Sequence, residues 1–431
     1  MYETRAAPTR TLVLYPVMRG RWKRPRDDER ALEEAVALAY AIDLEIISEE
    51  LISIRQPKPG TFLGTGQIKE LHGYIEANEI ELVFIDTTIS PVQQRNLEKG
   101  LDAKVIDRTG LILDIFGARA ATREGVLQVE MAALSYQRSR LVRSWTHLER
   151  QRGGLGAVGG PGESQLEIDR RLIDERLARL RKELDNVVHM REQHRGARRK
   201  VPYPIVALVG YTNAGKSTLF NRLTGANVYA DDKVFATLDP TMRGIDLPSG
   251  RRVILSDTVG FISDLPTTLV AAFRATLEEV IEADVMLHVR DMSDPDSAAQ
   301  SDDVLAVLDE LGIDAADRGD RMIEVMNKID LLDEEAKTVV TEQAERREDA
   351  IAISAITGEG LDALLDIVSR RVWAERQVVD LKLPVTAGAA ISFLYSHGEV
   401  LEREDDETEI TLKVGIEEVD LARFRKMERA T

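Results

Sequence analysis

The chain has 431 residues and a formal net charge of −18. Its length predicts two to four domains, and its acidity argues against a general coat for DNA or RNA, because phosphate binding needs cations. The sequence contains no cysteine, which excludes disulfides and thiolate metal sites. No apolar run approaches the roughly 18 residues that cross a bilayer, and Met1–Arg10 lacks a signal-peptide core. We therefore expect a cytoplasmic protein without a membrane span.

The N-terminal part alternates strand-like and helix-like stretches. "TLVLYPV" at 11–17 is typical of a strand, and "ERALEEAVALAYAI" at 29–42 of an amphipathic helix. Two short apolar runs, at 82–86 and 104–107, are each followed by a helical pattern. This alternation predicts a small α/β domain over residues 1–120.

The hydrophobic period changes after this domain. Two sets of positions, Leu127 to Leu148 and Leu166 to Val187, each advance by alternating steps of four and three residues and are apolar at all but one position. Such seams predict two helices that bury them against each other. We expect an antiparallel arm over residues 121–200, about 30 Å long if each helix has about 21 residues rising 1.5 Å apiece.

A glycine-rich stretch, "RQRGGLGAVGGPGESQLE" at 150–167, joins the two helices. Phosphate-binding glycine loops run from a strand into a helix, and no strand-like run precedes this one. We interpret it as the tip of the arm, where glycines allow close approach to a partner's backbone such as RNA. A passive connector is the alternative. Five arginines at 138–152 lie beside it; they predict either docking to an anionic partner or simple surface charge.

The strongest motif follows the arm. "PIVALVGYTNAGKSTLF" at 204–220 is an apolar strand, then Gly210-x-x-x-x-Gly215-Lys216-Ser217, then a helix start, which predicts a P-loop. We expect backbone N–H groups to wrap the phosphates, Lys216 to neutralise the β- and γ-phosphates, and Ser217 to ligate Mg²⁺. The candidate nucleotide-binding residues of this segment are Gly210, Tyr211, Thr212, Asn213, Ala214, Gly215, Lys216, Ser217 and Thr218.

Two further segments complete a phosphate site. A strand at 251–257 ends in Asp257-x-x-Gly260; the aspartate is expected to reach the Mg²⁺ shell and the Gly260 N–H to sense the γ-phosphate. A switch segment between this strand and the P-loop needs a threonine whose hydroxyl reaches Mg²⁺. Thr237 is our choice and Thr241 the competing candidate. The expected metal ligands are Ser217, Thr237 and Asp257.

A base-recognition motif comes next in the chain. The strand at 322–327 delivers Asn327-Lys328-x-Asp330, and a carboxylate there can accept hydrogen bonds from guanine N1–H and the 2-amino group, which predicts GTP rather than ATP. We expect Lys328 to lie over the base. Ser354 and Ala355 follow another strand, and the Ala355 N–H suits guanine O6. The order of these motifs predicts a GTPase domain over residues 201–375.

The expected reaction is in-line attack of water on the γ-phosphate, giving GDP and phosphate, carried by Lys216, Thr237 and Gly260. Phe261 stands where Ras-like GTPases place a water-orienting glutamine, so we predict slow intrinsic hydrolysis. Asn213 lies three residues before Lys216. Similar GTPases with asparagine there bind K⁺ beside the phosphates, although this residue also suits a purely structural loop.

These segments together resemble the HflX family, within the translation-factor-related GTPases. The resemblance rests on "GGLGAVGGPGESQLE", "GYTNAGKSTLFNRLTG", "KVFATLDPT", "DTVGFI", "NKID" and "SA" in this order. The quoted motifs carry the resemblance over residues 10–375, and we expect it to extend over the whole chain. It implies a GTPase that binds the large ribosomal subunit, through its RNA and proteins, and that splits stalled or idle ribosomes under stress. Nothing in the sequence suggests an obligate oligomer, so we expect a monomer.

The resemblance also implies a role for the arm. Its tip, Gly153–Gly162, is expected to enter the peptidyl-transferase centre, with Arg143, Arg150 and Arg152 as its basic flank. Residues 376–431 suggest a helix, two strands and a final helix. This small α+β domain is acidic, which suits either contact with a basic ribosomal protein or plain solubility.

Two other functions stay open. One is a binding factor for ribosome assembly or silencing, in which GTP hydrolysis is incidental. The other is an ATP-driven RNA remodeller acting through the N-terminal domain, although the sequence contains no second Walker motif.

Overall fold

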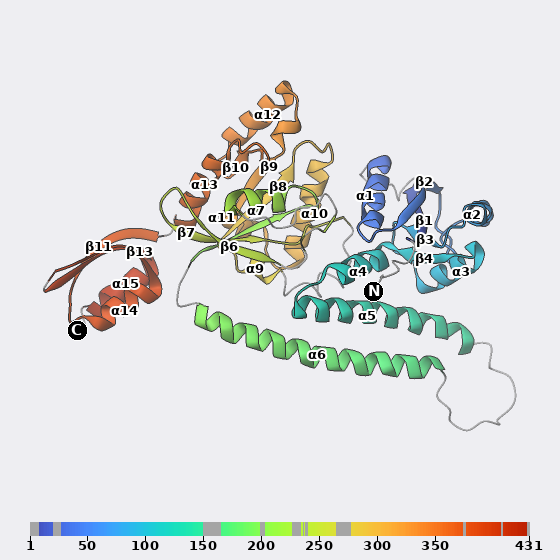
Figure 1. Cartoon of the computed structure of the whole chain (residues 1–431), viewed down its shortest axis with the longest axis horizontal. Helices are drawn as coiled ribbons and strands as arrows, with labels where there is room; N and C mark the ends of the chain where they lie inside the picture. The colour runs from blue at the N-terminus through green and yellow to red at the C-terminus, as the bar shows by residue number, and fades with distance from the viewer. Residues whose placement is uncertain are drawn as a thin grey trace, which may run out of the picture.

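The structure is a computed structural model that describes residues 8–19, 27–149, 165–198, 203–225, 234–235, 237, 240–263, 277–373, 376–406 and 408–428. Three sheets follow one another along this part of the chain, with four, six and three strands. A pair of long helices lies between the first and the second sheet in chain order (Figure 1). This arrangement confirms the expected class: a P-loop α/β unit, an α/β unit with a two-helix arm before it, and an α+β unit after it.

The N-terminal sheet is parallel, in the order β2-β1-β3-β4. Each strand except β1 enters it after a helix, because parallel neighbours need a crossover connection. The strands are β1 (Arg10–Met18), β2 (Glu45–Ile54), β3 (Leu82–Ile85) and β4 (Lys104–Asp107), and the helices are α1 (Asp28–Tyr40), α2 (Thr65–Ala77), α3 (Pro91–Leu101) and α4 (Arg108–Arg119).

Alternate side chains of β1 enter two different cores. Leu12 and Leu14 pack with the apolar faces of α2 and α3, whereas Val13 packs with α1 and α4. The helices therefore cover the sheet in pairs, α2 with α3 on one face and α1 with α4 on the other. Strand β2 was missed by the sequence analysis, because "EIISEELISI" is half polar and lies at the sheet edge.

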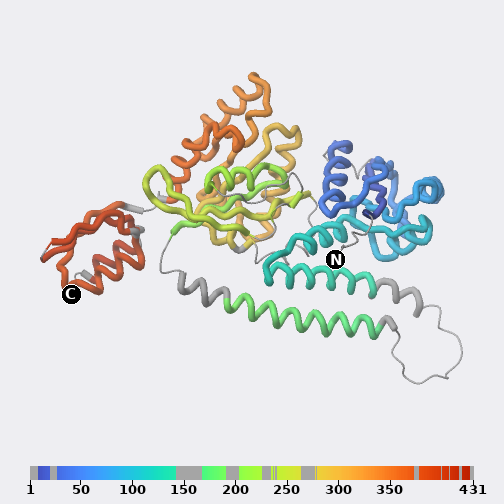
Figure 2. The backbone as a smooth tube through the Cα atoms, in the orientation of Figure 1, coloured from blue at the N-terminus to red at the C-terminus, as the bar shows by residue number. Residues whose placement is uncertain are grey.

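The arm consists of α5 (Arg123–Glu149) and α6 (Gln165–Arg198), with 27 and 34 residues, so both helices are longer than the roughly 21 residues expected. Figures 1 and 2 show them side by side. Of the predicted seam positions whose side chains are described, Leu127, Leu177 and Leu180 are buried. Arg138, the polar seam position of α5, forms an ion pair with Asp174 of α6 at 2.7 Å. The tip Gly153–Gly162, with Arg150, Arg152 and the side chain of Arg143, lies outside the described residues.

The central sheet has the order β10-β9-β8-β5-β7-β6, and only β6 runs antiparallel to its neighbour. Helices of this unit pack on both faces, as in other doubly wound folds (Figure 1). The strands are β5 (Ile205–Gly210), β6 (Thr241–Asp246), β7 (Arg252–Asp257), β8 (Val285–Asp291), β9 (Met322–Asn327) and β10 (Ala350–Ala352). The helices are α7 (Lys216–Thr224), α9 (Glu278–Ile281), α10 (Ser297–Glu310), α11 (Ala315–Arg321), the 3-10 turn η2 (Ile329–Leu331), α12 (Glu334–Glu345) and α13 (Leu361–Trp373).

The C-terminal unit has three antiparallel strands in the order β11-β13-β12, packed against two helices. Only two strands were expected here from the sequence, and β11 was missed; its Val379, Leu381 and Leu383 alternate toward the core. Asp380 and Lys382 lie between them, so this period of two was a usable signal for a strand. The elements are β11 (Arg376–Pro384), α14 (Gly388–His397), β12 (Gly398–Asp405), β13 (Glu409–Glu417) and α15 (Glu418–Glu428).

Among the described residues, no helix is long and apolar enough to span a membrane.

Candidate functional site

The carboxyl ends of three parallel strands bring the sequence motifs to one edge of the central sheet. Strand β5 ends at Gly210, β7 at Asp257 and β9 at Asn327. Glycine is required at two positions of the loop after β5. A Cβ at Gly210 would collide with the Val289 carbonyl oxygen, and one at Gly215 would collide with the Asn327 side-chain amide; both glycines have positive φ, +154° and +94°.

Lys216 opens helix α7 and is 6% exposed. Its ammonium Nζ donates to the carbonyl oxygens of Gly210 at 3.0 Å and Tyr211 at 2.7 Å. Burial lowers its pKa to about 8, against the opposing effect of Asp257. Because an ammonium has three donors, one N–H stays available for an anion in front of the loop.

Three oxygen-bearing side chains meet next to Lys216. The hydroxyls of Ser217 and Thr237 each donate to Asp257 Oδ2 at 2.8 Å, and they lie 3.0 Å from each other. Asp257 is fully buried, and its Oδ1 has no hydrogen-bond partner among the described residues. Burial raises the pKa of this carboxyl. Thr241, the competing candidate, begins β6 and pairs through its backbone with Asp257.

This cluster fits a hard divalent cation. Mg²⁺ in nucleotide sites takes one or two protein oxygens and completes its shell with phosphate and water oxygens. The unsatisfied Oδ1 of Asp257 is a buried acceptor of the required kind. The described residues contain no group of three His, Asp or Glu side chains that could hold a metal by themselves, so a cation here depends on the nucleotide for further ligands.

Gly260 and Phe261 lie beside the P-loop. A Cβ at Gly260 would be 3.0 Å from Thr212 Cα and 3.1 Å from Lys216 Nζ, so its backbone packs closely against the P-loop. The Phe261 N–H donates to the Gly210 carbonyl at 3.1 Å, and its own carbonyl accepts from Thr212 N–H at 2.7 Å. Its ring is buried in the core. Phe261 therefore fixes the backbone and presents no side chain that orients water.

Asn327 joins the P-loop to the loop after β10. Its amide Nδ2 donates to the Ala214 carbonyl at 2.9 Å, and its Oδ1 accepts from Ala355 N–H at 3.0 Å. The Ala355 N–H, expected to stand free for guanine O6, is thus already engaged. Ser354 is buried and its hydroxyl accepts from Thr357 N–H at 3.0 Å, which braces the turn.

The Asn327-Lys328-x-Asp330 motif ends in a carboxylate with an unsatisfied oxygen. Asp330 Oδ1 is buried and has no hydrogen-bond partner among the described residues, so it is an acceptor that awaits donors. Lys328 forms an ion pair with Asp291 at 2.6 Å. Asp291 was not predicted from the sequence, although its place at the carboxyl end of β8 was a usable signal.

A parallel sheet with a P-loop at one strand end, a buried Ser–Thr–Asp cluster beside it and an Asn–Lys–x–Asp motif two strands away defines a guanine-nucleotide-binding P-loop protein. Four family models match the chain in order: the GTP-binding GTPase N-terminal region over 29–117, its middle region over 119–198, the 50S ribosome-binding GTPase over 205–328 and the HflX C-terminal domain over 339–429.

The chain belongs to the HflX family of GTPases. It is 49% identical over 99% of its length to the GTPase HflX of Magnetococcus marinus, 96% of which is covered, and 44% identical over 94% of its length to that of Escherichia coli, 93% of which is covered. A solved GTP-binding protein of Sulfolobus solfataricus in complex with GDP aligns with a TM-score of 0.45 and 23% identity over 84% of this chain and 99% of that one. The family predicted from the sequence is confirmed, and the protein is a GTP-binding enzyme that hydrolyses GTP.

Proposed function

We propose that this GTPase binds the large ribosomal subunit and couples GTP binding and hydrolysis to ribosome splitting or rescue under stress. The main supporting observation is that the same chain contains a candidate nucleotide site, with Lys216 and Asp257 buried in it, and a long two-helix arm. The match to a 50S ribosome-binding GTPase model supports the choice of partner. The proposal describes a cytoplasmic monomer with four domains, over residues 1–120, 121–200, 201–375 and 376–431.

The P-loop residues 210–218 bind the phosphates of GTP in this proposal. Backbone N–H groups of the loop donate hydrogen bonds to the oxygens of the β-phosphate, and the free N–H of Lys216 turns toward the β- and γ-phosphates. Ser217 and Thr237 with Asp257 hold Mg²⁺, which when bound neutralises the phosphate charge. The Gly260 N–H senses the γ-phosphate. At the base, Asp330 accepts from guanine N1–H and its amino group, while Asn327 and Ser354 fix the loops that carry Lys328 and Ala355.

The low pKa of Lys216 gives the proposal a pH signature. The free protein carries a charged Lys216 below about pH 8, while bound phosphates keep it charged to higher pH, so GTP binding takes up a proton above that value. We expect the affinity for GTP to be level below about pH 7.5 and to fall about fivefold by about pH 8.8. Calorimetric titrations in two buffers of different ionisation enthalpy measure this uptake. An affinity that stays level up to pH 8.8 would contradict it.

A second cation, K⁺, is proposed to bind next to Asn213. This residue has a left-handed backbone conformation, with φ of 58°, in the middle of the P-loop, and we propose that it helps to hold K⁺ beside the phosphates. Since K⁺ would supply charge that Phe261 cannot, replacing K⁺ by Na⁺ is expected to slow hydrolysis about tenfold without changing GTP affinity. Single-turnover rates in the two salts at equal ionic strength decide the matter, and equal rates would leave Asn213 as a plain loop residue.

The arm is the part of the proposal that concerns the ribosome. Deleting residues 153–162 is expected to leave intrinsic hydrolysis unchanged and to abolish its stimulation by large subunits, because the deletion spares every residue around Lys216. Co-sedimentation with separated subunits and a GTP analogue tests binding in the same samples. If the deletion variant is stimulated as strongly as the parent, the tip is a passive connector. If the protein dissociates ribosomes with a non-hydrolysable GTP analogue, the result favours the alternative of a binding factor in which hydrolysis is incidental.

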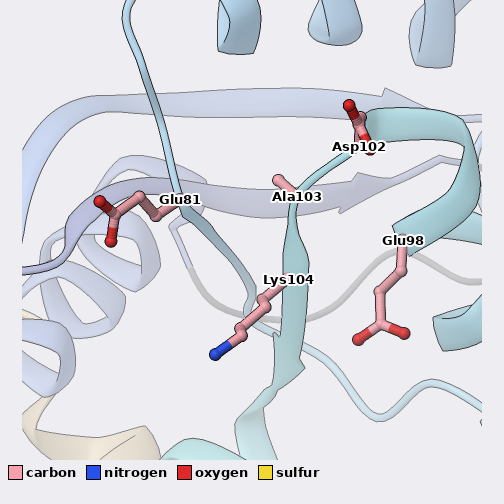
Figure 3. Close-up of a pocket in the computed structure, with 5 residues that line it drawn as sticks. All are labelled: Glu81, Glu98, Asp102, Ala103 and Lys104. Atoms are coloured by element: carbon pink, nitrogen blue, oxygen red, sulfur yellow. The ribbon is translucent and has the colours of Figure 1, made fainter.

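The ATP-driven alternative finds no support in the N-terminal unit. Figure 3 shows an open pocket at the edge of its sheet, with Glu81, Glu98, Asp102 and Lys104 around it. Three carboxylates against one ammonium repel the phosphates of ATP. This pocket therefore does not favour a second nucleotide site there.

A further inference from the structure

Helix α4 touches the segment that carries Thr237. The ring of Phe116 packs edge-on against the ring of Phe235, with centroids 4.7 Å apart and planes at 76°. Both rings are buried, and Phe235 lies two residues before Thr237. The N-terminal unit thus supports the backbone that brings the Thr237 hydroxyl to Asp257.

The first turn of the same helix touches the segment after Gly260. Arg108, which is 3% exposed, donates from Nη2 to the Ser263 carbonyl at 2.9 Å and forms ion pairs at 2.6 Å with Asp86 and with Glu34 of α1. Glu34 also accepts from the hydroxyl of Ser263 at 3.0 Å.

The network closes on the P-loop itself. The Tyr211 hydroxyl donates to Glu34, and it accepts from the Ser263 N–H at 2.9 Å. Tyr211 is the first residue after Gly210 and offers its carbonyl to Lys216. Two side chains from the N-terminal unit, Glu34 and Arg108, therefore hold Ser263 and Tyr211 together. Charge-assisted bonds in a buried site are strong and directional.

The residue that starts α4 also fastens the arm. Asp107 is fully buried and caps the helix by accepting from Gly110 N–H at 2.9 Å. Its carboxylate accepts from the Tyr136 hydroxyl at 2.5 Å and from Arg140 at 2.6 Å, both on α5. One helix end thus contacts the arm through Asp107 and the GTPase centre through Arg108.

We propose that Glu34 and Arg108 are positioning residues for the GTPase centre, and that α4 couples the arrangement of that centre to the position of the arm. They hold Ser263, while Phe116 of α4 supports the segment of Thr237 through Phe235, in the arrangement described here, in which the hydroxyls of Ser217 and Thr237 meet Asp257. This arrangement is the one that a triphosphate selects, because Thr237 and Gly260 face the γ-phosphate. The inference rests on the proposed function for the placement of that phosphate.

Coupling of this kind is reciprocal. If GTP stabilises the docked arrangement, then the docked arrangement favours GTP over GDP by the same factor. A ribosomal contact that moved the arm would be transmitted through Asp107 and Arg108 to residues 260–263. Weakening the Glu34 contacts should therefore reduce the preference for GTP over GDP. It should also reduce the change in the position of the arm between the two nucleotide states.

The test uses two variants one helical turn apart on α1. Glu34→Gln removes the charge that binds Arg108, whereas Arg30→Gln removes an exposed ion pair to Asp294, at 3.0 Å, that also joins the two units but lies away from the nucleotide residues. We expect Glu34→Gln to lower the ratio of affinities for a GTP analogue and GDP about tenfold, and Arg30→Gln to leave it within about twofold. Ser263→Ala, a smaller change on the GTPase side, is expected to act in the same direction.

The position of the arm is measured in the parent protein and in the same α1 variants. Since the chain has no cysteine, Leu172→Cys on α6 and Val339→Cys on α12, both exposed positions, give one specific pair of spin labels. We expect the label distance to differ between GDP and the analogue in the parent and in Arg30→Gln, and to lose this difference in Glu34→Gln.

Three outcomes would overturn the inference. The first is an unchanged affinity ratio in Glu34→Gln, which includes an equal loss of affinity for both nucleotides. The second is an equal effect of Arg30→Gln on the ratio, and the third is a label distance in the parent that is the same with GDP and with the analogue. If the parent protein bound the GTP analogue no more tightly than GDP, the proposed function would be overturned as well. This outcome can be distinguished from the others because it is measured on the parent alone, without any α1 variant.

Discussion

Lys216→Ala is expected to weaken GTP binding by at least about 30-fold, because truncating one member of a buried, hydrogen-bonded charge pair costs about 2–5 kcal/mol or more. In the free protein its ammonium is already fixed by the carbonyls of Gly210 and Tyr211, so it reaches the phosphates with little loss of side-chain entropy. Titration with a fluorescent GTP analogue at about pH 7, where Lys216 is charged, measures the loss.

Lys337→Ala is the matched control for this prediction. Lys337 lies on the same unit, and its ammonium forms an exposed ion pair with Glu359 at 2.8 Å, so its loss should change GTP affinity by less than about twofold. Thermal unfolding checks that the Lys216 variant is folded, because the substitution leaves the Tyr211 carbonyl and the buried Asp257 carboxylate without this ammonium. Retained micromolar affinity in a folded Lys216→Ala protein would rule out the P-loop as the phosphate site.

The local motifs of the site were predictable because each depends on residues close in sequence. The loop from Gly210 to Ser217 needs glycine where β8 and Asn327 approach it, and the strand before it is a continuous apolar run. The same reasoning found Asp257, Asn327 and Asp330, since all three follow strands whose carboxyl ends must meet at one edge.

The choice between Thr237 and Thr241 required the structure. Both follow the P-loop at suitable distances in the sequence, and only the fold shows that Thr241 starts β6 while the Thr237 hydroxyl reaches Asp257. The Ala355 N–H was assigned to guanine from its loop alone. Its actual acceptor, Asn327 Oδ1, depends on the packing of two loops that are 28 residues apart.

The contacts between the N-terminal unit and the nucleotide centre had no sequence signal. Glu34 sits on an ordinary amphipathic helix, 177 residues before Tyr211, and nothing in the helical period separates it from solvent-facing glutamates. Arg108 follows a short strand and reads as a helix-starting residue. Long-range pairs of this kind depend on how two folded units pack against each other. The hydrophobic periodicity of a single helix contains no information about that packing.

Asp330→Asn is expected to lower the affinity for GTP about 100-fold or more, since two hydrogen bonds to a charged acceptor contribute about 1.5–3 kcal/mol each. The affinity for xanthosine triphosphate should rise by a similar factor. Xanthine carries a C2 carbonyl in place of the amino group, so the new asparagine amide donates to that oxygen while its own oxygen still accepts from N1–H. Competition titrations with the two triphosphates and with ATP measure both changes.

Asp333→Asn provides the control three residues away. Asp333 caps α12 by accepting from Ala336 N–H at 2.8 Å, so its substitution affects a helix end and no base contact. It should cost less than about 1 kcal/mol of stability and leave nucleotide preference unchanged. If Asp330→Asn lost both triphosphates equally, the buried Oδ1 of Asp330 would be a structural acceptor. Selectivity for guanine would then have to come from other groups around the base, because Asn327 already joins the Ala214 carbonyl to the Ala355 N–H and Lys328 is paired with Asp291.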